Sequence, residues 1–532
     1  MIKNYIKIAW RTLWRDRAFS FINLIGLAVG LASVLMIMAY VRYELSYDTS
    51  YSNAPDVYRL SMAMQVNGVE RQSIMVPSTL AKTLSKEFPD ISKYSVLSIR
   101  DLKFKYNNGN VALKSVNATA DFFKLFNFKS IRGNLATALV EPNSVVVTES
   151  TAKKYFNGTD AIGKTINVVY ANKPYKITAI IPDIASNTHF AADAIISIEG
   201  DRSLNDKLDL RGYTGMPQYI LLNKTSNAAS FENRFKTFYK TYHFGKATIK
   251  LMPVQKIHLY SHTESELRPN SDIKYIYIFS SIAILILVIA CINYINLTTA
   301  RSIQRAREIG VRKVLGAVKT QLVTQFLAES FFFFTACLLL AMLLTTACWP
   351  VFSQVIDPYG GNIPLFSSWS FILMPIVILI FGLLSGLYPA FILSKIKTAQ
   401  VLKGITAFGI NVSMRKVLVA VQFVISGVLI ISTLIIYQQL NFISNARLGF
   451  NKEHLIAIPF FMFKSHVDVF KDELRTNPGV KDASVATWKA GEYFGGSATM
   501  PDAKDTTKTI TVQFINADPD FIKTMGINVI YG

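Results

Sequence analysis

The feature that most constrains this chain is a set of five long apolar stretches. Each runs for about 18 residues or more almost without charge, which is long enough for a helix to cross a bilayer. They occupy residues 18–43, 273–297, 323–349, 371–393 and 417–437. Composition agrees, because 51% of the residues are hydrophobic and only 17% are charged. We therefore predict an α-helical transmembrane bundle and exclude a disordered chain.

Basic residues cluster beside alternate spans. They fall in residues 1–17, after the second span, and between the fourth and fifth spans at 394–416. The positive-inside rule places these groups in the cytoplasm, so we expect a multi-pass protein of the bacterial cytoplasmic (inner) membrane with a cytoplasmic N-terminus. The net charge of +21 then reflects membrane topology, and no nucleic-acid partner is expected. Residues 1–17 also form an apolar stripe opposite a basic one, which predicts an amphipathic interfacial helix.

Residues 44–272 form a polar segment long enough for a domain outside the membrane. Short runs rich in β-branched and aromatic residues predict strands at 57–64, 144–147, 175–181, 218–222 and 249–252. Helical spacing appears at 78–88, 149–156 and 230–239, with Thr148 as an N-cap. The fold class predicted is therefore a transmembrane bundle with an inserted α+β extracytoplasmic domain.

The chain resembles itself at an offset of 399 residues. Asn117–Gly133 aligns with Asn516–Gly532, and the first span with its basic flank aligns with the fifth. The repeat unit is thus a span followed by an outside domain, and residues 438–532 would be an incomplete second domain. We expect the sequence to be part of a protein of roughly 800 residues, because the second copy stops before most of its core.

A basic segment, TARSIQRAREIGVRKVLGAVKTQLVTQFLAES, follows the second span. It combines a broken apolar stripe with many cations, and Gly310 and Gly316 lie where helix continuity is weakest. A short helix on the cytoplasmic face, at 298–322, could dock into a cleft on a soluble partner and pass motion to the spans. An ordinary basic loop explains the same residues, and physics alone leaves both open.

An ordered set of motifs resembles one family across essentially the whole chain. The run RAREIGVRKVLGA at 305–317 resembles the signature of MacB/FtsX-type ABC transporter permeases. The other landmarks, in chain order, are YELSYD at 43–48, IPDI at 181–184, GLYPAFILS at 386–394, VLKG at 401–404 and RKVLVAVQF at 415–423. The duplicated, eight-span kind fits better than the single-copy kind, with the second half C-terminally truncated here.

The resemblance implies a MacB-like periplasmic core domain at 44–272 and an FtsX-like unit made of the second to fourth spans. It also implies a helix that couples the permease to a dimer of a separate ABC-type ATPase, which would hold ATP and magnesium, so this chain needs no cofactor. The coupling residues would be Arg305, Arg307, Glu308, Ile309, Gly310, Val311, Arg312, Lys313 and Gly316. Among them, the glycines would bend or closely pack the helix, and Arg312 and Lys313 would meet acidic groups on the ATPase.

One motif argues for nucleotide binding in this chain itself. Residues 158–165, GTDAIGKT, match the P-loop pattern. A P-loop needs a strand before the glycines and a helix after them, whereas here the helix precedes and the strand follows. We therefore interpret these residues as a turn.

Two weaker patterns concern helix packing and metals. The pairs Gly26–Gly30 and Gly382–Gly386 have the G-x-x-x-G spacing that lets helices approach closely, although an ordinary lipid-facing position explains them equally well. The histidines and the three cysteines show no metal-ligand spacing, and no catalytic constellation stands out.

The sequence therefore predicts a non-enzymatic permease subunit that couples ATP hydrolysis on its partner to movement of its outside domains, for export or extraction of a substrate. A periplasmic adaptor or outer-membrane component is a further expected partner. The alternative is an FtsX-like signalling scaffold that activates an envelope hydrolase. A membrane-anchored enzyme working outside is a third reading.

Overall fold

The structure is a computed structural model of the chain. It describes residues 17–66, 69–99, 102–106, 109–169, 174–205, 207–208, 214–223, 228–244, 247–263, 265–315, 318–357, 412–446, 448–458, 467–487, 496–501 and 509–531, with short pieces between 375 and 387. The helix predicted at 1–17 lies outside these ranges except for Arg17, which begins the first described helix. The chain forms two compact units, one of residues 1–63 and 72–428 and one of residues 64–71 and 429–532.

Four of the described helices are long and apolar enough to cross a membrane. They are α2 (Arg17–Leu45), α8 (Ile273–Val314), α9 (Lys319–Ile356) and α12 (Val412–Asn445). The residues of each helix include one of the predicted spans. The remaining predicted span, 371–393, falls mostly outside the described residues, and its described pieces are helical.

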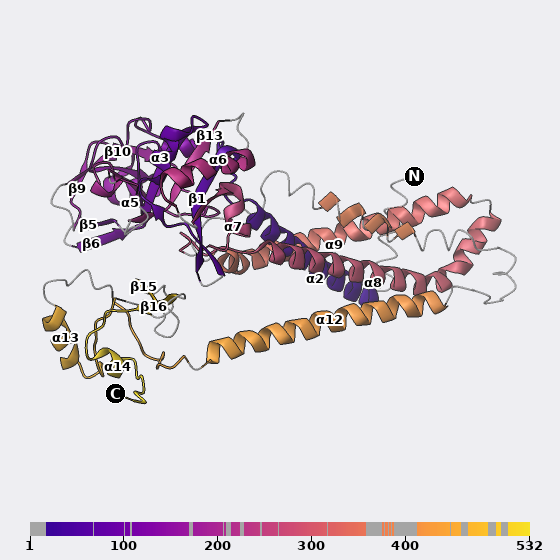
Figure 1. The fold of residues 1–532 in the computed structure, drawn as a ribbon. Coiled ribbons are helices and arrows are strands. Elements are labelled where there is room, and N and C mark those ends of the chain that lie inside the picture. Colours follow the sequence, from indigo (N-terminus) through magenta and orange to yellow (C-terminus); the bar gives the residue numbers. More distant parts are fainter. Residues whose placement is uncertain are drawn as a thin grey trace. The chain divides into compact units, whose positions relative to one another are not determined.

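In the first unit, α2, α8 and α9 run alongside one another (Figure 1). Apolar side chains from all three form one buried cluster, joined by Ile378 of the fourth predicted span. Its other fully or nearly buried members are Leu27, Leu31, Ala32, Leu35, Leu287, Phe334, Cys337, Leu338 and Ala341. Helices without many polar groups pack in this way by van der Waals contact.

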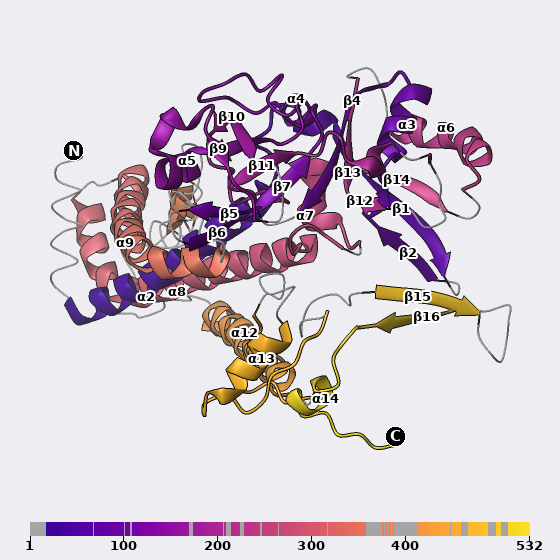
Figure 2. The ribbon, with the colours of Figure 1, turned by 90° about the vertical axis from the view of Figure 1, so that its left-hand side faces the viewer.

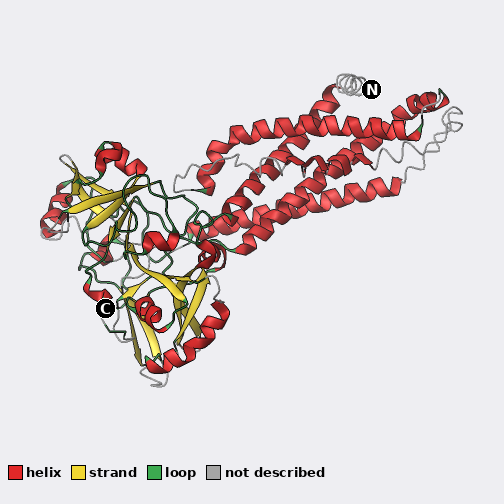
Figure 3. Ribbon diagram, turned by 90° about the horizontal axis from the view of Figure 1, so that it is seen from above, coloured by secondary structure: helices red, strands yellow, loops and turns green. Residues whose placement is uncertain are grey.

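Between α2 and α8 the chain forms an α+β domain, which confirms the predicted fold class (Figures 2 and 3). In the described residues, its main sheet has the order β14-β1-β13-β4-β7-β11-β8-β10-β9, with β2 beside β1. Most neighbours are antiparallel, but β8 and β10 pair in parallel, as do β7 and β11. The strands are β1 (Val57–Val66), β2 (Val69–Ser73), β4 (Ile91–Ile99), β7 (Ser115–Ala118), β8 (Ser144–Thr148), β9 (Thr165–Ile166), β10 (Tyr175–Ile181), β11 (Ala194–Ser197), β13 (Gln218–Leu222) and β14 (Thr248–Pro253).

Smaller elements complete this domain. Two short ladders pair β3 (Val76–Pro77) with β12 (Gly215–Met216) and β5 (Leu102–Tyr106) with β6 (Gly109–Leu113). The helices are α3 (Leu80–Glu87), α4 (Phe122–Phe126), α5 (Glu149–Phe156), α6 (Ala228–Thr241) and α7 (Ile257–Tyr260). All five predicted strands and all three predicted helices are present, with Thr148 at the N-cap of α5.

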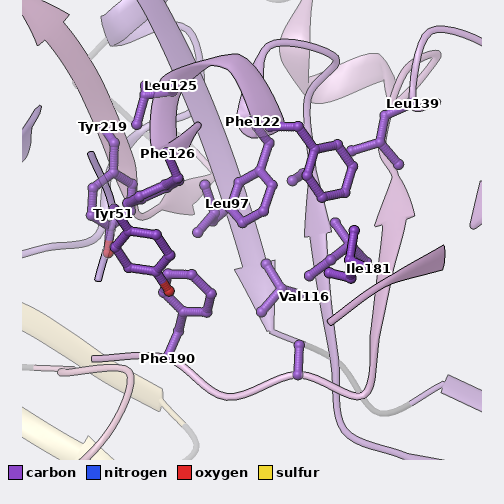
Figure 4. Close-up of a cluster of buried hydrophobic side chains, with 14 of the residues drawn as sticks. Tyr51, Leu97, Val116, Phe122, Leu125, Phe126, Leu139, Ile181, Phe190 and Tyr219 are labelled. Atoms are coloured by element: carbon purple, nitrogen blue, oxygen red, sulfur yellow. The ribbon is translucent and has the colours of Figure 1, made fainter. Parts of the chain in front are cut away.

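Apolar clusters among the described residues hold the domain together, and three of them are large. One lies between α3, α6 and the strands β1, β13 and β14, and one lies beneath β5, β6 and α5. The largest surrounds α4, where the rings of Phe126 and Phe190 pack against Tyr51, and the ring of Phe122 packs against both phenylalanines (Figure 4). Aromatic rings at these separations contribute more than their buried area alone.

The second unit contains the end of α12, then α13 (Val467–Thr476), the hairpin of β15 (Gly496–Pro501) and β16 (Thr509–Phe514), and α14 (Phe521–Thr524). Carboxylates of Asp482, Asp518 and Asp520 bind Lys471 and Arg475 of α13. The charged cluster ties α13 to the residues before α14.

The predicted repeat extends to the backbone hydrogen bonds. In the first copy, Leu125 N donates to Asp121 O and Phe128 N to Phe123 O; in the second, Thr524 N donates to Asp520 O and Ile527 N to Ile522 O. Asn127 and Gly526, which are 399 residues apart, both have left-handed backbones, with φ of 53° and 62°. The same helical turn therefore occurs at equivalent positions.

Candidate functional site: the coupling helix and the membrane–domain junction

The predicted coupling segment is the continuation of a membrane helix. Eight of its nine candidate residues, Arg305 to Lys313, lie in α8, which is helical without interruption from Ile273 to Val314. Their side chains, and Gly316 altogether, lie outside what the structure describes. The short helix expected on the cytoplasmic face is instead the end of α8, and the helix is continuous through Gly310, where its continuity was expected to be weak. One glycine costs about 1 kcal/mol in a helix, and the good helix formers around it outweigh that cost.

The continuous helix α8 is longer than the membrane core is thick. With 42 residues and a rise of 1.5 Å per residue, the helix is about 63 Å long. The hydrocarbon core of a bilayer is about 30 Å thick. One continuous helix is therefore long enough to reach from the base of the α+β domain past the thickness of a hydrocarbon core.

The two G-x-x-x-G pairs differ in their surroundings. A Cβ atom built at Gly382 would lie 2.5 Å from Phe334 Cγ, and one at Gly386 would lie 2.5 Å from Ser330 Oγ, so both glycines allow close contact with α9. At Gly26 such an atom would meet nothing within 4 Å, and at Gly30 it would be 3.7 Å from Ile286. The second pair is thus the closely packed one.

Polar side chains join α8 to α9 at the same level. The Tyr294 hydroxyl donates to Ser330 Oγ at 2.7 Å, and Ser330 Oγ donates to the carbonyl of Phe326 at 2.9 Å. The Tyr294 ring also packs edge-on against Phe334, with centroids 4.9 Å apart. Tyr294 of α8, two side chains of α9, and the glycines of the fourth predicted span thus form one packing site.

The P-loop-like residues have the element order predicted from the sequence. Helix α5 precedes them, a 3-10 turn covers Gly158–Ala161, and strand β9 follows. The Lys164 ammonium donates to the carbonyl of Phe156 at 2.9 Å, which closes the end of α5. A P-loop requires the opposite order, so this lysine has a structural role here.

At the outer end of α2, the YELSYD motif is buried in the base of the domain. The Glu44 carboxylate is 2.9 Å from His258 Nε2, and the ring of Tyr47 stacks on His258 at 3.4 Å. Asp48, with φ of 56°, binds His189 Nδ1 at 2.8 Å. In the sequence, this motif indicated only the family resemblance. The available signal was a pair of carboxylates directly after a span, because charges in such a place need partners.

The titratable groups of the described residues do not form a metal site, because no three histidine, cysteine or acidic side chains converge there. His262, four residues after His258, lies beyond α7, and its Nε2 atom is 3.7 Å from the Asp272 carboxylate. The polar groups of the junction instead bind one another.

Comparisons with known proteins match this architecture. The family model of the MacB-like periplasmic core domain matches residues 20–237, and that of the FtsX-like permease C-terminal matches residues 280–398. The fold and these matches define a membrane permease with an inserted extracytoplasmic domain. The chain belongs to the MacB/FtsX-type ABC transporter permeases.

Individual relatives are distant. The pyoverdine export ATP-binding/permease protein PvdT of Pseudomonas syringae pv. syringae (strain B728a) is 22% identical over 340 residues, covering 61% of this chain and 48% of the relative. The macrolide export ATP-binding/permease protein MacB of Escherichia coli (strain K12) is 21% identical over 345 residues, covering 61% and 49%. The chain spans about half the length of the curated relatives it matches.

Solved structures resemble the chain over part of its length. The periplasmic region of MacB from Actinobacillus actinomycetemcomitans covers 37% of this chain and 90% of its own, with 17% identity and a TM-score of 0.27. The extracellular domain of the noncanonic ABC-type transporter YknZ from Gram-positive bacteria covers 37% and 99%, with 9% identity and a TM-score of 0.28.

Proposed function

We propose that this chain transmits ATP-driven movement from a separate cytoplasmic ABC-type ATPase dimer to its extracytoplasmic domain, for export or extraction of a substrate. The observation that carries the proposal is α8, one continuous helix of 42 residues that begins at the base of the domain and contains eight of the nine predicted coupling residues. Displacement of its cytoplasmic end would reach the domain without an intervening loop.

In this proposal the spans act as levers. The side chains between α2, α8 and α9 form an apolar cluster, which offers little to a hydrophilic substrate in transit. Names of the relatives point to export of pyoverdine and macrolides, and we propose the same class of activity here, with a periplasmic adaptor or outer-membrane component as a further partner. ATP and magnesium would be held by the ATPase, since the P-loop-like residues 158–165 have the wrong element order.

The topology and duplication belong to the same proposal. The N-terminus would lie in the cytoplasm, in agreement with the basic residues at 1–17. The repeated helical turn at Phe122–Phe126 and Phe521–Thr524 supports the duplicated, eight-span kind of permease.

Charge reversal at the coupling residues tests the proposal. Arg312→Glu with Lys313→Glu should lower co-purification of the ATPase with the full chain about tenfold or more, because each reversal places like charges opposite acidic groups. The control is Lys274→Glu at the outer end of the same helix, where the side chain is 81% exposed. Equal recovery of the ATPase with both variants would contradict the assignment of Arg312 and Lys313.

A further inference from the structure

Buried polar groups tie the outer end of α2 to the domain. The loop after α2 is bound at its backbone, since Asp48 N donates to the carbonyl of Asn187 at 3.0 Å and Asn187 Nδ2 donates to the carbonyl of Ser46 at 3.0 Å. The carboxylates of Glu44 and Asp48 bind His258 and His189. The side chains of these four residues are at most 8% exposed.

A second set ties the residues that lead into α8. The guanidinium of Arg59, on β1, is fully buried and binds the Glu266 carboxylate at 2.5 and 2.8 Å. Ser261 Oγ and Thr263 Oγ1 donate to the same carboxylate. Arg268 Nη1 donates to the carbonyls of Ser186 and Thr188, at 2.8 and 3.0 Å.

The two sets share their partners. Residues 186–189 bind both the loop after α2 and Arg268, while the carbonyl of His258 accepts a hydrogen bond from Ser271 N at 2.9 Å. His189 Nε2 also binds the Tyr219 hydroxyl of β13 at 2.8 Å. The ends of both spans are therefore joined to each other and to the main sheet by one network.

Such a network restrains sliding and hinging at the junction more strongly than apolar packing does. Buried ion pairs add little net stability compared with apolar side chains of similar size, but removal of one partner leaves a buried charge. Sliding or hinging at this junction would separate Arg59 from Glu266 and Glu44 from His258, and each separation would leave polar groups unpaired. An apolar joint could instead slide through many similar arrangements.

We propose that these residues form a junction clasp that makes α2, α8 and the domain move as one rigid body. The positioning residues are Glu44, His258, Arg59 and Glu266. The clasp delivers a displacement of the cytoplasmic end of α8 to the domain as a tilt, and no hinge at the membrane surface absorbs it. The source of that displacement rests on the proposed function, whereas the rigidity is a property of this chain alone.

Pulsed electron–electron double resonance on the full chain in nanodiscs tests the clasp without ATPase or nucleotide. One nitroxide replaces Lys153, a 64% exposed side chain on α5, and the other replaces Leu315, which is 81% exposed directly after α8. The native thiols of Cys291, Cys337 and Cys348 are changed to alanine. The width of the distance distribution between the labels reports whether the domain follows α8.

Three variants are compared with the parent. Arg59→Met with Glu266→Met removes the ion pair without leaving a buried charge. Glu44→Ala removes the acceptor for His258, and Glu44→Gln keeps an oxygen that can accept the same hydrogen bond. The matched control, Arg234→Gln with Asp90→Asn, removes an ion pair of 2.8 Å at the surface of the same domain.

We expect a narrow distribution for the parent, the surface control and Glu44→Gln, and a distribution roughly twice as wide for the other two variants. Hydrogen exchange should accelerate about tenfold at the amides of Asp48 and Ser271 and stay slow in β8 and β10, which shows that the domain is folded. If the variant with both methionines loses hydrogen-exchange protection in β8 and β10, its domain is not folded. The width of the distance distribution in Glu44→Ala then tests the clasp.

Two results would overturn the clasp. One is a broad or two-peaked distribution in the parent chain. The other is a distribution in Glu44→Ala as narrow as in the parent, with β8 and β10 protected. Neither result depends on the ATPase, so failure of the clasp and failure of the proposed coupling are distinguishable.

Discussion

Gly382→Val should loosen the membrane bundle, because the space beside Gly382 is already filled. A Cβ atom there would lie 2.5 Å from Phe334 Cγ and 2.8 and 2.9 Å from the two neighbouring ring atoms. Phe334 is 1% exposed and is held by the ring of Tyr294, so it has little room to move. Overpacking of this kind costs about 1–3 kcal/mol, which corresponds to roughly 5- to 150-fold in an equilibrium.

The buried thiol of Cys337 provides the assay. It is fully buried in the same apolar cluster as Phe334, so a maleimide reaches it only when the helices separate. With Cys291 and Cys348 changed to alanine, the labelling rate in Gly382→Val should rise by the factor given above. The control is Gly26→Val, where a Cβ atom meets nothing within 4 Å. Equal labelling rates in the two variants would refute the packing argument.

Three further outcomes are expected. Burial raises the pKa of Glu266, but the hydrogen bonds and charge of Arg59 outweigh it, so the pKa lies below its ordinary value of 4.5. The stabilisation is fully present above that ordinary value and is lost as the pH falls through the lowered pKa. Amide exchange at Ser271 should therefore accelerate only at pH values below 4.5. Lys164→Ala should leave ATP binding by the full chain unchanged in a filter-binding assay, and a loss would restore the P-loop reading. Phe122→Ala, at a fully buried ring, should lower the free energy of domain unfolding in urea by about 3–5 kcal/mol, whereas a change below about 1 kcal/mol would contradict the role of this ring in the core.

Sequence patterns predicted the elements with strong local signals. The apolar runs predicted the spans, and the strands β1, β8, β10, β13 and β14 follow from dense β-branched and aromatic residues. Strands β4, β7 and β11 were not predicted. The sequence of β7, SVNA, is short and half polar, and its pairing with β11 joins residues almost 80 positions apart.

The contacts at the junction could not be predicted from the sequence for a similar reason. Arg59 and Glu266 are 207 residues apart, and Glu44 and His258 are 214 apart. Periodicity reports which face of an element is buried, but not which distant charge will meet it. The motif YELSYD signalled its carboxylates, whereas their histidine partners carry no local pattern.

The extent of the coupling helix was harder to predict. Gly310 marks a point of weak helix continuity in the sequence, but α8 is continuous through it as far as Val314. The propensity of single residues is a weak signal, and the surrounding arginine, glutamate and alanine residues decide the local structure. The repeat was a stronger signal, because Asp121 and Asp520 begin the same hydrogen-bonded turn.

Cross-linking from the native membrane tests the central claim most directly. The full chain is isolated in mild detergent after cross-linking, and the peptides joined to residues 301–317 are identified by mass spectrometry. The account predicts an ABC-type ATPase attached through this segment. Recovery of the chain with no ATPase, or with an ATPase attached only elsewhere, would contradict the account.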